Sequence, residues 1–234
     1  MKILAIDTAT EACSAALYID GELTSRYQLA PRQHSQLILK MIDDLLAEAN
    51  TTVTDLDAIA FGRGPGSFMG LRIAAGVVQG IAFAYDIPVV PVSTLKAIAQ
   101  RAYEETGINQ VMVAIDARMQ EVYWCPYRIN HQQWLPDGEE QVIAPGKIDV
   151  AEILARYEEP WVGAGTGWGS YADSLLSANR FQLHTILAEC LPSAEAIAKL
   201  AVKQFEAGHT VSAAEAIPVY LRNDVARKPK PIVL

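Results

Sequence analysis

The chain repeats one pattern in its two halves, and this duplication constrains the fold more than any other feature. Residues 3–7 form an apolar run that ends in Ile-Asp, and a second strand-like run follows over 14–19. Residues 111–116 also end in Ile-Asp and are followed by a strand-like run over 121–127. Short apolar runs bounded by turn residues are typical of β-strands. The sequence therefore predicts two related lobes, each opening with a β-hairpin.

Between the strands, apolar residues recur at the spacing of an amphipathic helix. One helix is expected to begin with Ser35 as its cap. Its apolar stripe contains Leu37, Ile38, Met41, Ile42 and Leu45. A later helix is expected to have Ser193 as its cap and to end at Gly208. Strands that alternate with such helices favour an α/β protein whose sheets are covered by helices.

Composition indicates an ordinary globular chain. It has 234 residues, of which 51% are hydrophobic and 20% charged, so it can bury a substantial core. We predict an N-terminal lobe over 1–105 and a C-terminal lobe over 106–234, with a late helix near 193–207 as a candidate to pack back on the first lobe. The start runs directly into a strand, and polar residues interrupt the most apolar window, 71–92. These features predict a cytoplasmic protein without a membrane-spanning segment.

The charge balance disfavours direct binding of nucleic acid. The formal net charge is −8, whereas affinity for a phosphate backbone comes largely from Lys and Arg. The basic stretch 222–230 is the exception, and we interpret it as a solvated tail, with an RNA contact as the less favoured alternative. The three cysteines lie outside any Cys-x-x-Cys pattern, which argues against a disulfide framework or a cysteine zinc site. They are Cys13, Cys125 and Cys190.

A glycine-rich loop from Gly62 to Gly70 joins a strand-like run to a helix-like run. Glycine tolerates positive φ and allows close approach of another backbone or a ligand. The loop lacks the Gly-Lys-Ser/Thr ending of a nucleotide-binding P-loop and the Gly-x-Gly-x-x-Gly spacing of a dinucleotide site. Two interpretations of the loop therefore stay open: it binds an anion, or it packs a helix closely on a strand.

Five segments carry a resemblance to a known family. They are MKILAIDTAT at 1–10, GPGSFMGLR at 64–72, IDAR at 115–118, EVY at 121–123 and PVYLRN at 218–223. Together, and in this order along the whole chain, they resemble the bacterial TsaB family, also called YeaZ. The resemblance implies an actin-like, sugar-kinase-like (ASKHA) fold of two ribonuclease-H-like lobes, with mixed sheets covered by helices. It also implies a role in making threonylcarbamoyladenosine next to the anticodon of tRNAs, beside a catalytic paralogue, TsaD, and an ATPase, TsaE.

The same resemblance indicates that the metal site of the catalytic relatives is missing. Those relatives carry a His-His-x-x-Gly-His type motif at the start of a helix after an apolar strand, which here corresponds to 88–92. The two ligand positions would be Thr94 and Ile98, and neither side chain can replace an imidazole. The four histidines have no ligand spacing, so we predict that each is a surface or capping residue and that no metal binds. They are His34, His131, His184 and His209.

Nucleotide binding and catalysis are also disfavoured. Actin-like ATPases use Asp-x-Gly-Thr hairpins, but here Asp7 and Asp116 stand without those glycines. We expect Asp7 to accept hydrogen bonds from local backbone N–H groups. The neighbours His34 and Ser35 form no protease triad, because adjacent helical residues do not face each other. We assign no catalytic residue and no cofactor, although ATP at the complex or between the lobes stays open. The residues that could contact a nucleotide are Asp7, Asp116, Gly163 and Gly165.

Two apolar helical stripes are candidates for a partner surface. Gly76 and Gly80 leave one helical face without side chains, which permits close approach of another helix. By resemblance, these helices form an interface with a second copy or with the catalytic paralogue. The alternative is that both stripes face only their own sheet. The predicted interface consists of Leu37, Ile38, Met41, Ile42, Leu45, Ile73, Gly76, Val77 and Gly80.

The leading functional hypothesis is a non-catalytic subunit that docks on a TsaD-type transferase and holds it in an active arrangement. In this hypothesis the chain meets a TsaE-type ATPase through the complex and contacts tRNA only indirectly. It binds no membrane. The alternative, from another class, is an independent actin-like ATPase or small-molecule kinase.

Overall fold

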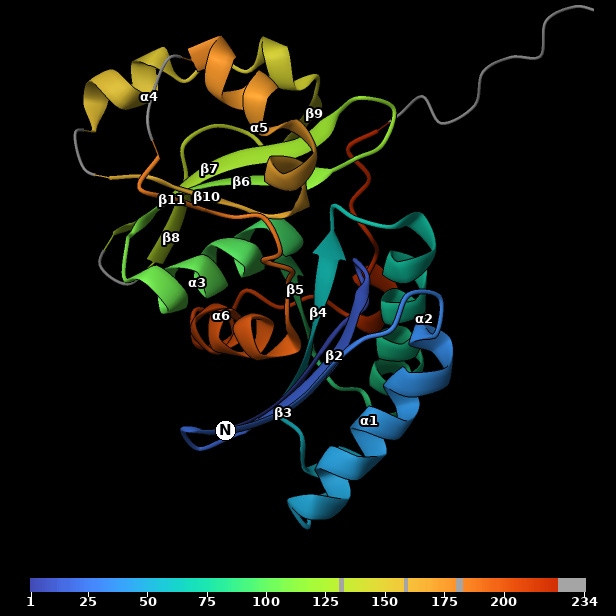
Figure 1. The fold of residues 1–234 in the computed structure, drawn as a ribbon. Helices are drawn as coiled ribbons and strands as arrows, with labels where there is room; N and C mark the ends of the chain where they lie inside the picture. Colours follow the sequence, from blue (N-terminus) through green and yellow to red (C-terminus); the bar gives the residue numbers. More distant parts are fainter. Residues whose placement is uncertain (131–132, 158–159, 180–182, 223–234) are drawn as a thin grey trace, which may run out of the picture.

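A computed structural model shows two β-sheets stacked one above the other with helices around them (Figure 1). The structure describes residues 1–130, 133–157, 160–179 and 183–222. The first sheet has the strand order β3-β2-β1-β4-β5. Its strands are β1 (Lys2–Asp7), β2 (Ala12–Ile19), β3 (Glu22–Leu29), β4 (Ala58–Gly64) and β5 (Val89–Ser93).

The second sheet repeats the topology of the first. Its order is β11-β10-β6-β7-β8, and β9 pairs with β7. In each lobe the first strand is antiparallel to the second and parallel to the strand that follows the first helical connection. This duplication confirms the predicted α/β class with two related lobes. The strands are β6 (Gln110–Asp116), β7 (Val122–Asn130), β8 (Gln133–Pro136), β9 (Gln141–Ile143), β10 (Val162–Ala164) and β11 (Thr185–Leu187).

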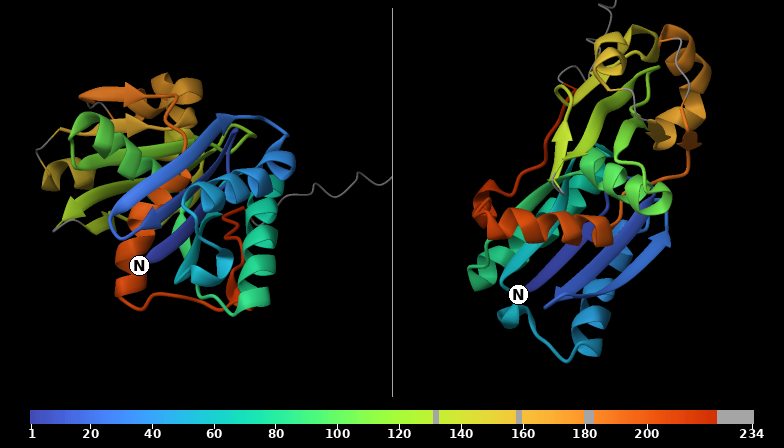
Figure 2. Two further views of the ribbon diagram at one scale, coloured as in Figure 1. Left: turned by 90° about the horizontal axis from the view of Figure 1, so that it is seen from below. Right: turned by 90° about the vertical axis from the view of Figure 1, so that its left-hand side faces the viewer.

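Helices cover both sheets. They are α1 (His34–Glu48), α2 (Phe68–Tyr85), α3 (Thr94–Thr106), α4 (Ala151–Arg156), α5 (Thr166–Asn179) and α6 (Ala194–Glu206). Three short 3₁₀ turns complete the described part of the chain: η1 (Val53–Asp55), η2 (Pro145–Lys147) and η3 (Ala213–Glu215). Helices α1 and α2 pack side by side on one face of the first sheet, whereas α4 and α5 lie on the far face of the second (Figures 1 and 2).

The two helices between the sheets belong to opposite lobes. Helix α3 follows β5 of the first sheet, yet its Ile98 packs in one core cluster with Val113 of the second. Helix α6 follows β11 of the second sheet, yet its Ile197 packs with Ile3 of the first. The two helices also contact each other (Figure 1). Each lobe therefore completes the hydrophobic core of the other.

The predicted helix ends are partly confirmed. The side chain of Ser193 caps α6 by accepting a hydrogen bond from the Ala196 amide at 3.3 Å, and Gly208, with φ of 74°, follows the end of this helix. The cap assigned to Ser35 is wrong, because α1 begins at His34 and its N-cap residue, Gln33, makes no side-chain capping bond. A turn closed by the Gln33 amide and the Ala30 carbonyl starts this helix earlier than predicted.

Among the described residues, α2 is the one helix whose length and apolar composition would allow it to cross a membrane. Its Leu71, Ala74 and Val78 are nevertheless buried, and the latter two belong to the core of the first lobe. This is the pattern of a helix that covers a sheet.

Candidate functional site

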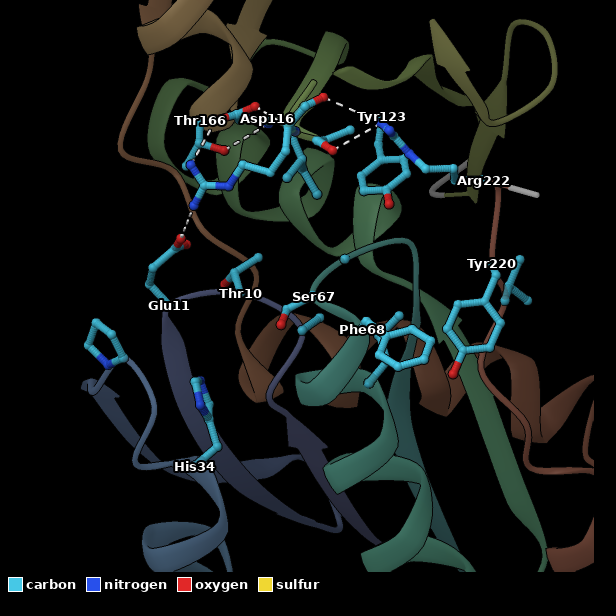
Figure 3. Close-up of a pocket in the computed structure, with 18 of the residues that line it drawn as sticks. Thr10, Glu11, His34, Ser67, Phe68, Asp116, Tyr123, Thr166, Tyr220 and Arg222 are labelled. Atoms are coloured by element: carbon cyan, nitrogen blue, oxygen red, sulfur yellow. Dashed lines mark hydrogen bonds and ion pairs between the residues drawn. The ribbon is translucent and has the colours of Figure 1, made fainter. Parts of the chain in front are cut away.

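A cavity of about 680 Å³ lies between the two lobes, where strand ends and helix starts converge (Figure 3). Its first-lobe wall contains the β1–β2 turn and the starts of α1 and α2. Its second-lobe wall contains the β6–β7 turn and the start of α5. The segment 219–222 closes one side. The polar and aromatic residues of the lining include Thr10, Glu11, His34, Ser67, Phe68, Asp116, Arg118, Tyr123, Thr166, Tyr220 and Arg222.

The β6–β7 turn has an unusual backbone. Arg118, Met119 and Gln120 are three consecutive residues with φ of 62°, 56° and 61°. Side-chain-bearing residues in this left-handed region cost roughly 1–2 kcal/mol each, so external contacts must hold the turn. Two backbone bonds close it: the Ala117 amide donates to the Glu121 carbonyl at 2.9 Å and the Glu121 amide to the Arg118 carbonyl at 3.1 Å. No glycine marks this turn, and the sequence interpretation missed it.

Arg222 supplies the contact that holds the turn from outside. Its guanidinium donates to the Ala117 carbonyl at 3.1 Å and forms an ion pair with Glu121 at 2.7 Å. Three residues earlier, the Val219 amide donates to the Arg63 carbonyl of β4 at 2.7 Å. The segment 219–222 thus connects the first lobe to the left-handed turn of the second.

We expect Arg222→Ala to destabilise the protein by about 2 kcal/mol, because it removes charge-assisted hydrogen bonds from a strained turn. Equilibrium unfolding in urea measures the change. The matched control is Arg118→Ala in the same turn, where the side chain is 78% exposed and its nearest carboxylate oxygen lies at 3.4 Å. This control should shift stability by less than about 0.5 kcal/mol. Equal effects of the two variants would contradict the role given to Arg222.

Asp116 lies in the cavity lining, and its polar groups organise the second-lobe wall. Its carboxylate accepts a hydrogen bond from the Arg118 amide at 2.8 Å and lies 3.4 Å from the Arg118 guanidinium. Its own amide donates to the Thr166 hydroxyl at 3.1 Å, which joins β6 to the start of α5. Across the cavity, Arg118 also lies 4.0 Å from Glu11 of the first lobe.

Asp7 does not reach the cavity. Its side chain is fully buried at the end of β1, beside Gly62 and Ile197 of α6. One carboxyl oxygen accepts a hydrogen bond from the Ala9 amide at 3.2 Å, which confirms the predicted local bond, and the other has no partner among the described residues. Burial raises the pKa of Asp7 to about 7.

Gly163 and Gly165 are explained by packing and do not line the cavity. A Cβ atom at Gly163 would lie 2.8 Å from the Trp168 ring. At Gly165, where φ is 104°, it would lie 2.4 Å from the Ala114 carbonyl oxygen.

The glycine-rich loop before α2 is also closely packed. A Cβ atom at Gly66 would lie 2.5 Å from the Ala9 carbonyl oxygen, and one at Gly70 would lie 2.0 Å from that of Thr8. Of the two interpretations of this loop, the structure shows close packing, here against the β1–β2 turn. The same loop contributes Gly66 and Ser67 to the cavity lining.

Thr94 and Ile98, which correspond to the metal-ligand positions of the catalytic relatives, are both buried. Within the described ranges, no group of three or more His, Cys, Asp or Glu side chains could hold a metal ion. The prediction for His34 is wrong, because this residue is buried and lines the cavity. His184 and His209 are exposed, as predicted, while His131 and the tail beyond residue 222 lie outside the described residues.

The structure corrects the predicted partner surface on α1. Ile38, Met41, Ile42 and Leu45 are buried in the core of the first lobe, because α1 uses its whole apolar stripe to cover the sheet. Leu37 is half-buried against the same core. These side chains offer no free surface for a partner.

Helix α2 is different, because it has an apolar face on its outer side. Gly76 and Gly80 are exposed, and no described atom lies within 4 Å of a Cβ built on either. The two ends of this face, Met69 and Phe83, are 64% and 84% exposed, and neither belongs to the predicted interface. We define the α2 outer face as Met69, Ile73, Gly76, Val77, Gly80 and Phe83.

Comparison with known proteins places the chain among relatives of the same length. Residues 26–229 match the family TsaD, tRNA N6-adenosine threonylcarbamoyltransferase. The chain is 44% identical over 232 residues to the tRNA threonylcarbamoyladenosine biosynthesis protein TsaB of Escherichia coli K12, covering 99% of both chains. It is 41% identical over 239 residues to the protein of the same name from Haemophilus influenzae, covering 99% of this chain and 98% of that one.

A solved structure agrees with these matches. YeaZ from Pseudomonas aeruginosa is 45% identical and superposes with a TM-score of 0.87, covering 94% of this chain and 99% of the other. Sequence identity, length and fold therefore agree, and the chain belongs to the TsaB (YeaZ) family, within the wider TsaD family of tRNA N6-adenosine threonylcarbamoyltransferases.

Proposed function

We propose that this chain is a non-catalytic subunit for the formation of N6-threonylcarbamoyladenosine in tRNA, next to the anticodon. Its relatives from Escherichia coli and Haemophilus influenzae are named as threonylcarbamoyladenosine biosynthesis proteins. Thr94 and Ile98 stand at the positions where catalytic relatives would need histidines. This difference favours an accessory role over a catalytic one. We place its action in the cytoplasm, beside a TsaD-type transferase.

The α2 outer face is the observation that carries this proposal. Exposed apolar side chains that gather on one face mark interaction sites on soluble proteins. Phe83 and Met69 are 84% and 64% exposed, and Gly76 and Gly80, which lie between them on the helix, carry no side chain. A helical face with glycines lets a second helix approach closely, since interhelical distance depends on the side chains at the contact.

We propose a TsaD-type transferase as the occupant of this face. The match to the TsaD family over residues 26–229 means that the two proteins share a family fold, so each can present an equivalent helix to the other. The net charge of −8 supports indirect contact with tRNA, through the partner. A TsaE-type ATPase would join through the same complex, and a second copy of this chain would compete for the same face.

The test is size-exclusion chromatography with light scattering on the chain alone and mixed with a TsaD-type transferase, with a tRNA modification assay on each fraction. The proposal expects a heterodimer, and modification only in the fractions that contain it. Transfer of threonylcarbamoyl by the solitary chain would overturn the non-catalytic role. Phosphate release from ATP by the solitary chain would instead support an independent ATPase or kinase.

A side chain added at one of these glycines should separate docking from folding. We expect Gly80→Ala to stabilise the free chain by roughly 0.5–1 kcal/mol, because alanine is a better helix former than glycine. The same added methyl should weaken the heterodimer by about tenfold or more, because it keeps the partner helix at a greater distance. Urea unfolding and titration calorimetry measure the two effects.

The matched control is Gly146→Ala in η2, where an added Cβ also meets no described atom within 4 Å. It should leave the affinity unchanged. An unchanged affinity of Gly80→Ala would remove α2 from the interface.

A further inference from the structure

We propose that a second cavity, which we call the Lys96 cavity, binds a small molecule that carries a single carboxylate group. The cavity has a volume of about 620 Å³, which lies in the range of small-molecule sites in proteins. None of its lining residues belongs to the α2 outer face, so the proposal goes beyond the docking role. The polar side chains of the lining include Arg63, Ser93, Lys96, Tyr127, Glu139, Glu140, Gln204 and His209.

Two cationic side chains of this cavity lack hydrogen-bond partners. The Lys96 ammonium group makes no hydrogen bond or ion pair to any described residue. Within the same described ranges, the Arg63 guanidinium has one carboxylate neighbour, a Glu140 oxygen at 3.7 Å, which is too far for a hydrogen bond. Both cationic side chains are half-buried. A charged group that is partly removed from water without hydrogen bonds is unfavourable, so this pair indicates a place for an anion.

The position of Lys96 in the fold makes its charge still less favourable. Strand β5 leads into α3 between the two sheets, and Lys96 lies in the first turn of that helix, which contains no acidic residue (Figure 1). The N-terminus of a helix carries a partial positive charge, which repels a cation. Burial lowers the pKa of Lys96, an effect that Glu140 opposes and Arg63 increases. An anion beside the ammonium group would offset the charges of the helix end and of Arg63.

Glu140 does not supply this anion, because the second-lobe wall holds it elsewhere. One of its carboxylate oxygens accepts a hydrogen bond from the Tyr127 hydroxyl at 2.6 Å, and the other is the neighbour of Arg63. Tyr127 is fully buried, and its hydroxyl oxygen lies 3.4 Å from that of Ser93. Glu140 therefore stays with Tyr127 and leaves the Lys96 ammonium group to a ligand.

The charges of the lining determine the ligand class. Arg63 and Lys96 contribute two positive charges, and Glu139 and Glu140 contribute two negative ones. The two carboxylates would repel a second negative charge on the ligand, so a carboxylate fits better than a phosphate dianion. The apolar part of the lining would contact an aliphatic body attached to the carboxylate, and it consists of Pro91, Pro136, Val219 and Leu221.

The test is a titration of the full chain with sodium butyrate at constant ionic strength, followed by NMR of the Lys96 ε-carbon. The proposal expects a saturable shift of this carbon with butyrate, and none with butylamine hydrochloride or sodium chloride. Absence of a saturable shift with butyrate would overturn the site. A parallel titration with sodium phosphate tests the ligand class, and tighter binding of phosphate than of butyrate would overturn the carboxylate assignment.

Lys96→Met tests the cation directly, because methionine keeps most of the side-chain length without the charge. We expect it to weaken butyrate binding by about tenfold or more in titration calorimetry, the effect of losing a charge-assisted hydrogen bond. The matched control is Lys40→Met in α1, which changes the net charge equally at a side chain that is 72% exposed. It should leave the affinity unchanged. Equal affinities of the Lys96→Met and unmodified proteins would contradict the assignment.

Glu140→Gln tests the sign of the ligand charge. Glutamine can still accept the hydrogen bond from Tyr127, while the negative charge is removed. The variant should bind butyrate roughly threefold more tightly or better, because one repulsive carboxylate is gone. Weaker binding would show that the cavity prefers a cation and would overturn the proposal. Urea unfolding of each variant separates an effect on binding from an effect on folding.

Discussion

Gly70→Ala is expected to prevent stable folding of the first lobe. A Cβ atom at this position would lie 2.0 Å from the carbonyl oxygen of Thr8 and 3.1 Å from its carbon. Neither backbone can easily withdraw, because the Thr8 hydroxyl donates to the Gly70 carbonyl at 2.7 Å and the Ser67 amide donates to the Ala9 carbonyl at 2.7 Å. Relief of the clash requires separation of α2 from the β1–β2 turn.

We expect this substitution to lower the free energy of unfolding by about 4 kcal/mol or more, which places it among the most damaging single changes. Unfolding in urea followed by far-UV circular dichroism measures the loss. The four tryptophans, Trp124, Trp134, Trp161 and Trp168, all lie in the second lobe, so their fluorescence reports separately on that lobe.

The matched control is Gly76→Ala in the same helix, where no described atom lies within 4 Å of the added carbon. It should stabilise the chain by roughly 0.5–1 kcal/mol. A Gly70→Ala protein as stable as the Gly76→Ala protein would show that α2 does not contact the β1–β2 turn this closely.

The second large effect concerns pH and the buried carboxyl of Asp7. Burial raises its pKa in the folded protein from 3.8 to about 7. Below pH 3.8 both the folded and the unfolded chain hold this proton. As the pH rises from 3.8 to 7, the unfolded chain releases the proton while the folded chain keeps it, so folding loses stability. Above pH 7 the carboxyl is ionised in both states and the loss is complete, at roughly 4 kcal/mol.

Asp7→Asn isolates this effect from the other titrating groups. The amide cannot ionise, and its oxygen can still accept the hydrogen bond from the Ala9 amide. Relative to the unmodified chain, the variant should gain roughly 4 kcal/mol of stability between pH 4 and pH 8, measured by urea unfolding at several pH values. A difference between the two proteins that stays constant over this range would show that the Asp7 pKa is not raised.

The partner surface shows where sequence pattern stops being informative. The stripe containing Ile38 and Met41 has the spacing of an apolar helical face, and the same spacing serves an internal core and a partner interface equally well. Burial in the first lobe decides for the core. On α2 the predicted glycines do lie on the outer face, while the exposure of Phe83 depends on which side of the helix the sheet occupies.

The cavity residues show a second kind of limit. His34 has no sequence motif around it. It lines the cavity together with Thr10 only because the fold brings the start of α1 there. The left-handed turn at Arg118 contains no glycine, and the side chain that holds it, Arg222, comes from the far end of the described chain. Neither feature has a signal within a short window of sequence.

The amino-acid sequence was enough to predict the duplicated strands, the α/β class and the family. These follow from local patterns, because alternation, apolar runs and residue identity are properties of neighbouring residues. Tertiary structure alone decided that α3 and α6 complete the core of the opposite lobe, that α1 is internal while α2 has an outer face, and that Thr10 and His34 share a cavity. Each of these depends on contacts between residues far apart in the chain, which the packing of whole elements determines.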